Sequence, residues 1–185
     1  MSSFRRTYKK IHDTKNITGT EIAVDNIFDM GREEYLIVGN GFTAVTGTHF
    51  IFRLRECGTT NSDSDHDRGQ LVIQHGQGSV ITQGATNNAS MATLTYFGTD
   101  DNHTGNFKIW YYQGTKAGYP SLHHQSIGHV NGTGYRLQSG GGFKEEQTYF
   151  DGFVVNFNGQ TMSDGRLRVF KTDVNAGRYV WVLKF

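Results

Sequence analysis

Apolar and polar residues alternate along short stretches of the chain, and segments rich in glycine and asparagine separate these stretches. A period of two places successive side chains on opposite faces of a β-strand. No window has the 3.6-residue apolar period of an amphipathic helix. The pattern predicts strands at 4–11, 21–28, 34–38, 49–56, 70–74, 79–82, 92–97, 106–112, 126–130, 134–138, 152–158, 166–171 and 178–184.

So many short strands without helical crossovers predict an all-β fold, with antiparallel sheets packed as a β-sandwich or jelly roll. The composition agrees, because the 185 residues include 24 glycines, 13 phenylalanines, 9 tyrosines and one proline. Glycine favours turns, and aromatic residues favour strands. No linker or break in composition divides the chain, so a single domain over residues 1–185 is expected.

The alternation also predicts which side chains form the core. The inward sets of three strands are Phe50, Phe52 and Leu54; Phe153, Val155 and Phe157; and Tyr179, Trp181, Leu183 and Phe185. In "GNFKIWYYQG", inward Phe107, Ile109 and Tyr111 leave Trp110 and Tyr112 facing outward. Such a large outward pair is covered by a loop, packed against a neighbouring subunit, or open to a ligand.

Two long segments carry a resemblance to a known family. They are "YKKIHDTKNITGTEIAVDNIFDMGREEYLIVGN" and "FDGFVVNFNGQTMSDGRLRVFKT". Their order of strands and links resembles the jelly-roll virion proteins of tailed bacteriophages, which are small tail-fibre, baseplate or head-decoration components. The resemblance implies a non-enzymatic structural protein that is assembled into the virion in the host cytoplasm. Its expected partners are other virion proteins and further copies of itself, a trimer being one option.

The resemblance also implies a variable polar loop after the "FRLR" strand, in "ECGTTNSDSDHDRGQ". One departure is the C-terminal segment "DVNAGRYVWVLKF", which continues past the point where similar proteins end. That extra strand is interpreted as an interface element of this protein.

The polar loop contains alternating aspartates, Asp63, Asp65 and Asp67, followed by Gly69. Carboxylates at this spacing can bind calcium. An EF-hand loop, however, has glycine at its sixth position and glutamate at its twelfth, where this chain has Arg68 and Gln74. A solvated loop tip is therefore favoured over a metal site, and no cofactor is expected.

The histidines in "LHHQSIGH" are a second candidate metal site. His123 and His124 would point to opposite faces of a strand, and no ligand set with the usual zinc spacing includes them, His129, His75 or His103. Histidines that meet their copies on a trimer axis remain an alternative.

No catalytic signature is found. Glu145 and Glu146 with Asp151 could serve as a carboxylate pair, but adjacent glutamates diverge in a strand. Cys57 and His49 lack an orienting partner, so a buried or half-buried thiol is expected.

The net charge is +1, and no apolar run approaches the ~18 residues of a membrane span. Neither nucleic acid nor a membrane is therefore expected as a partner. The N-terminal segment has no apolar run typical of a secretory signal. Its basic cluster, Arg5, Arg6, Lys9 and Lys10, is interpreted as a solvated strand edge or as a surface that docks on an acidic virion protein.

The leading prediction is a structural virion protein. The alternative is a module that binds a host-surface carbohydrate or receptor through Trp110, Tyr112, Tyr119 and the polar loops, since sugars stack on exposed aromatic rings.

Overall fold

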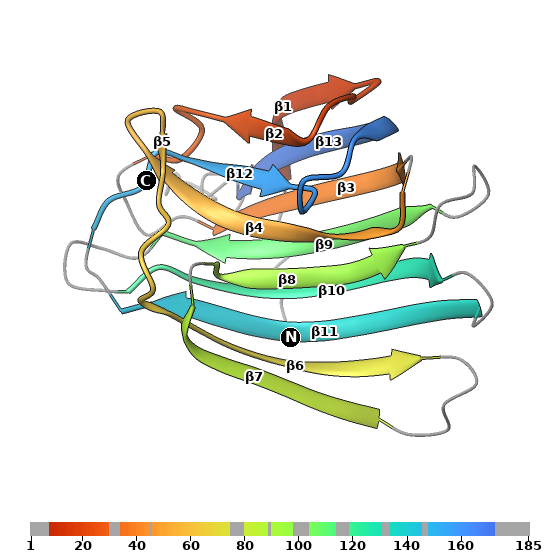
Figure 1. The fold of residues 1–185 in the computed structure, drawn as a ribbon. Coiled ribbons are helices and arrows are strands. Elements are labelled where there is room, and N and C mark those ends of the chain that lie inside the picture. Colours follow the sequence, from red (N-terminus) through yellow and green to blue (C-terminus); the bar gives the residue numbers. More distant parts are fainter. Residues whose placement is uncertain are drawn as a thin grey trace, which may run out of the picture.

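The computed structural model describes residues 8–29, 34–44, 46–74, 80–88, 90–97, 104–113, 119–130, 134–145 and 148–172. These residues form strands, turns and loops. None of them belongs to a helix that is long and apolar enough to cross a membrane. Two antiparallel sheets pack face to face, so the all-β sandwich predicted from the sequence is confirmed (Figure 1).

The larger sheet has eight strands. In spatial order they are β1 (Tyr8–Lys15), β13 (Met162–Thr172), β3 (Glu34–Ala44), β9 (Gly105–Tyr112), β10 (Ser121–Val130), β11 (Gly134–Lys144), β6 (His66–Gln74) and β7 (Val80–Asn88). The smaller sheet contains β2 (Glu21–Val24), β12 (Gly152–Asn156), β4 (Thr48–Glu56) and β5 (Thr59–Thr60), and β8 (Ala92–Phe97) also pairs with β4.

Four strands of the larger sheet lie beyond the part that faces β2, β12 and β4, and we call β10, β11, β6 and β7 the extension. In chain order, β6 and β7 are inserted between β4 and β8, and β10 and β11 between β9 and β12. Strand β8 contacts β10 and β11, whereas β6 and β7 project past the smaller sheet (Figure 1). The extension is thus built from two separate insertions that pair with each other.

The core lies between the two sheets, and its residues follow the predicted alternation. Phe50, Phe52 and Leu54 of β4 are fully buried, as are Phe153, Val155 and Phe157. Phe107, Ile109 and Tyr111 of β9 are buried on the opposite sheet. The Phe50 ring lies 5.1 Å from that of Phe42 and 5.0 Å from that of Phe107. Burial of these aromatic side chains supplies much of the stability of the sandwich.

Several strand boundaries differ from the prediction. Strand β6 begins at His66, so Asp67, Arg68 and Gly69 belong to a strand and not to the polar loop. Strand β10 begins at Ser121, and β11 continues to Lys144. These segments contain histidines or consecutive glycines, which have weak strand propensity, and pairing with neighbouring strands overrides it. In contrast, β2 ends at Val24, before Asn26 with its φ of 52°.

The predicted strand 178–184, with its core set Tyr179, Trp181, Leu183 and Phe185, lies outside the described residues, as do Arg5 and Arg6. Short strand β5 was not predicted.

Candidate contact face of the larger sheet

We call the side of the larger sheet that faces away from the smaller sheet the outer face. Buried Ile109 and Tyr111 face the core, so Trp110 and Tyr112 lie on the outer face, as predicted. The ring centroids of Trp110 and His123 are 5.3 Å apart across β9 and β10. Tyr112 and Tyr119 remain exposed, at 44% and 51%. The three aromatic residues that were predicted to bind a ligand therefore lie near the C-terminal end of β9 and the N-terminal end of β10.

The outer face of the extension carries a row of branched apolar side chains. The sheet register places Ile127 opposite Leu137, Leu137 opposite Ile73, and Ile73 opposite Val80. Each of the four side chains is 39–59% exposed. Cross-strand neighbours contact one another, so these residues form one continuous ridge across four strands, the apolar row. Monomeric proteins seldom expose contiguous apolar surface of this kind without a binding role.

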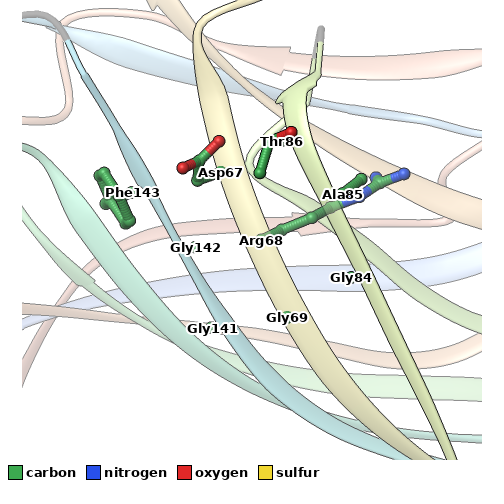
Figure 2. Close-up of a pocket in the computed structure, with 9 residues that line it drawn as sticks. All are labelled: Asp67, Arg68, Gly69, Gly84, Ala85, Thr86, Gly141, Gly142 and Phe143. Carbon is green, nitrogen blue, oxygen red and sulfur yellow. The ribbon is translucent and has the colours of Figure 1, made fainter.

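A second row of the same face has almost no side chains. Gly141, Gly69 and Gly84 are direct neighbours on β11, β6 and β7, and we call them the glycine row. Figure 2 shows them side by side, with Asp67, Thr86 and Phe143 towards one end. They line a shallow groove of about 620 Å³. Between the two rows lies a middle row composed of Gln125, Ser139, Leu71 and Thr82.

The fold itself does not require glycine at two of these positions. A Cβ atom added at Gly69 would meet no atom within 4 Å, and one at Gly84 would meet only a carbonyl oxygen at 3.6 Å. Gly140 differs, since a Cβ there would lie 2.4 Å from the Gly69 carbonyl oxygen. Glycine within a strand without such a need marks a place where another backbone or ligand comes close.

Charge is distributed unevenly over the outer face. Among the described residues of the extension, Asp67 is the only carboxylate, lysine or arginine on this face. The other half of the sheet carries Lys10, Asp13, Lys108, Arg166 and Arg168. The Arg166 side chain donates hydrogen bonds to the Asp13 carboxylate at 2.8 and 2.9 Å. One half is thus a solvated charged surface, and the other is nearly uncharged.

The inner face of the extension is polar where β8 covers it. Arg68 donates hydrogen bonds to the hydroxyls of Ser90 (2.8 Å) and Thr93. His124 is buried, and its Nδ1 has no hydrogen-bond partner among the described residues. Burial, together with nearby His123 and Arg68, lowers the pKa of His124 to about 4. Burial also lowers the pKa of His49, helped by Arg136 and Arg68. Both effects favour neutral imidazoles at pH 7.

The three aspartates of the polar loop do not converge on a common point. Asp65 accepts a hydrogen bond from the fully buried Lys144, and Asp63 accepts one from Asn61 at 3.1 Å. Asp67 lies in β6 on the outer face. Within the described residues no cluster of histidine, cysteine, aspartate and glutamate could hold a metal ion. The structure instead gives Asp65 an ion-pairing role.

The remaining candidates are also separated. His123 is exposed and His124 is buried, on opposite faces of β10 as predicted. Glu145 is exposed after β11, and Glu146 lies outside the described residues. The expectation of a buried or half-buried thiol at Cys57 is wrong: Cys57 is exposed in a tight turn, with a φ of 47°.

The basic cluster lies partly on β1, which is an edge strand of the larger sheet. Lys9 and Lys10 are exposed, and the Lys10 Nζ lies 2.8 Å from the Asp13 carboxylate. Lysines on an edge strand discourage pairing with another chain. The opposite edge, β7, has the sequence VITQGATNN and no charged residue.

Sequence reasoning did not identify the apolar row or the glycine row. Their residues come from separate segments, so only the register between strands reveals that they are neighbours. The available signal was apolar residues on both faces of one strand, since Leu71, Val72 and Ile73 are consecutive in β6, and Val80 and Ile81 are consecutive in β7. No protein-family model, curated protein sequence or solved structure matches the chain.

Proposed function

We propose that this protein is a non-enzymatic structural component that packs against other proteins through the outer face of its extension. The observation that carries the proposal is the apolar row, in which Ile127, Leu137, Ile73 and Val80 are neighbours and all exposed. A surface of this kind gains free energy when a second apolar surface removes it from water. The setting that we propose is the virion of a tailed bacteriophage, supported by the resemblance in the sequence.

The order of the sandwich strands supports a jelly-roll interpretation of the fold. Strands β1, β13, β3 and β9 form one layer of the sandwich and β2, β12, β4 and β8 the other, with β8 also lying over β10 and β11. Successive strands of the chain, such as β1 and β2 or β3 and β4, lie in alternate sheets for much of the chain. A jelly roll distributes eight strands over two sheets in this manner. In this interpretation the extension is an addition to the jelly roll, and it supplies the contact face.

The experiment uses the phage that encodes this chain. Particles are purified from phage that carries the wild-type protein and from phage that carries the Leu137→Lys variant, which places a charge in the apolar row. Mass spectrometry measures the amount of this protein in each. The proposal predicts that the wild-type protein is present in the particle in a stoichiometric amount. The Leu137→Lys variant should remain soluble and folded but should be absent from the particle. Ala23→Lys, an exposed strand position in β2, is the matched control and should be incorporated normally. Absence of the wild-type protein from particles would refute the proposal.

A second candidate function is carbohydrate binding at the ends of β9 and β10. Tyr112 and Tyr119 are exposed aromatic rings at one end of β9 and β10. A hollow of about 190 Å³ towards the other end of these strands is lined by Asn40, Asn106 and Gln125, whose side chains carry amides. Sugars stack on aromatic rings and hydrogen bond to amides. A glycan array decides this point: binding that disappears in Tyr112→Ala, with an unchanged melting temperature, would favour this function. Lack of binding on a broad array would exclude it for the glycans displayed.

A further inference from the structure

We propose that the outer face of the extension binds a second copy of this chain, face to face, around a two-fold axis that runs along the middle row. This inference rests on the proposed function, because it names one partner of the same contact face. In this dimer, Leu137, Ile73 and Val80 of the apolar row occupy the glycine row of the other copy, and the fourth side chain, Ile127, comes over His123. Figure 2 shows the glycine positions that would receive it.

The spacing of the two rows makes this arrangement self-complementary. Ile73 and Gly69 lie on β6, equally far from Leu71 in the middle row. Leu137 and Gly141 lie equally far from Ser139 on β11, and Val80 and Gly84 equally far from Thr82 on β7. A two-fold rotation about the middle row therefore brings Ile73 over Gly69, Leu137 over Gly141 and Val80 over Gly84 of the other copy. A two-fold interface is isologous, so each of these contacts occurs twice.

The glycine row has the shape that such a ridge needs. Neither Gly69 nor Gly84 is required by the fold of the single chain, since a Cβ atom at Gly69 meets nothing within 4 Å. Two stacked sheets pack about 10 Å apart, with their side chains interdigitated. Branched side chains on one sheet fit where the facing sheet has no side chains. A separate ligand is not needed to explain the glycines.

Charge and area also favour a second copy as the occupant. In a face that meets itself, like charges would oppose one another, and among described residues this face carries only Asp67. The extension has four strands, of which β10 has ten residues. At ~4.8 Å between strands and ~3.4 Å per residue, its outer face has an area of roughly 600–700 Å². Specific, stable interfaces bury about 1,200–2,000 Å² in total, and two such faces together would bury roughly 1,200–1,400 Å², at the lower end of that range.

The test is sedimentation equilibrium of the purified full chain at concentrations from about 1 to 200 μM, a range suited to dissociation constants near the micromolar level. We expect a species of twice the 20.7 kDa chain mass. Gly69→Val fills the groove, and Ile73→Ala removes the ridge; each single variant should raise the dissociation constant at least ~10-fold. The double variant Gly69→Val, Ile73→Ala exchanges ridge and groove, and it should restore part of the affinity.

Thermal melting at low concentration, where the chain is monomeric, verifies that each variant folds. A wild-type chain that is monomeric at every concentration would overturn the inference, and so would a trimer. A dimer that is insensitive to Gly69→Val would overturn it too, because its contact must then lie elsewhere, such as at the β7 edge. A monomer that is still incorporated into particles would leave the proposed function standing, while a dimer absent from particles would refute the function and not the dimer.

Discussion

The buried Nζ of Lys144 donates a hydrogen bond to the carboxylate of Asp65, 79 residues earlier in the chain. The same ammonium group lies 5.7 Å from the centre of the Phe150 ring, and the ring of His66 lies 3.5 Å from the other Asp65 oxygen. The ion pair fixes the polar loop to the end of β11. Asp65 therefore stabilises the fold instead of contributing to a calcium site.

Asp65→Asn removes the carboxylate that neutralises a fully buried lysine. Breaking a buried ion pair typically costs ~3–5 kcal/mol, and we expect roughly 3 kcal/mol because the Asp65 side chain is 30% exposed. Asp63→Asn, at an exposed position, should change stability by less than ~0.5 kcal/mol. Urea denaturation measures both. A rise in the wild-type melting temperature on addition of calcium, lost in both variants, would contradict this account.

His124 predicts a loss of stability in mild acid. Its pKa is lowered from 6.5 to about 4 in the folded state, so the unfolded chain binds a proton first as the pH falls. The contribution of neutral His124 to the free energy of unfolding is complete above pH 6.5 and declines from there towards pH 4. At pH 5 the loss is about 2 kcal/mol. In His124→Phe the decline between pH 7 and pH 5 should be correspondingly smaller. The exposed His123→Phe is the control, and an identical pH dependence in all three proteins would rule out this assignment.

The Asp13–Arg166 ion pair predicts an effect at lower pH. Hydrogen bonds from Arg166 and Lys10 hold the pKa of Asp13 well below its usual value of 3.8. The contribution of this carboxylate is complete above that value and is lost as the pH falls below it. Asp13→Asn should lower the melting temperature at pH 7, and the difference from wild type should shrink below pH 3.8. A difference that stays constant down to pH 2 would argue against the ion pair as its cause.

Two glycines in strands should respond oppositely to substitution. A Cβ atom at Gly39 would lie 2.3 Å from the Phe107 ring, so Gly39→Ala should cost ~1–3 kcal/mol by overpacking the core. Gly69→Ala has open space and should leave the stability of the monomer unchanged or slightly higher. Calorimetry at low concentration compares them. Strong destabilisation by Gly69→Ala would mean that the fold itself needs this glycine.

The alternation of apolar residues was sufficient to predict the β-sandwich and the core faces of β4, β9 and β12. In Phe50, Phe52 and Leu54 the local pattern and the tertiary burial agree. The same reasoning predicted β10 and β11 to be shorter than they are. Histidine and glycine have no strong strand preference, and they acquire their conformation from paired neighbours.

The contact face could not be predicted from the sequence, for a physical reason. Leu137 and Ile73 are adjacent only because β11 pairs with β6 in one particular register, and a shift of one residue would turn either side chain inward. The Lys144–Asp65 ion pair depends on the same pairing, in which Lys144 lies opposite His66. Outward Trp110 and Tyr112, in contrast, follow from alternation within one strand, and the prediction located them correctly.

The central claim is that other protein surfaces cover the apolar row in the assembled state. Hydroxyl-radical footprinting with mass spectrometry measures this directly, by comparing side-chain oxidation in purified particles with that in the dilute isolated chain. We predict strong protection in the particle of Ile73 and Leu137 in the apolar row and of Leu71 in the adjacent middle row, while exposed Tyr119 is oxidised equally in both states. Equal oxidation of the three apolar side chains in both states, or protection confined to Tyr119, would contradict the account.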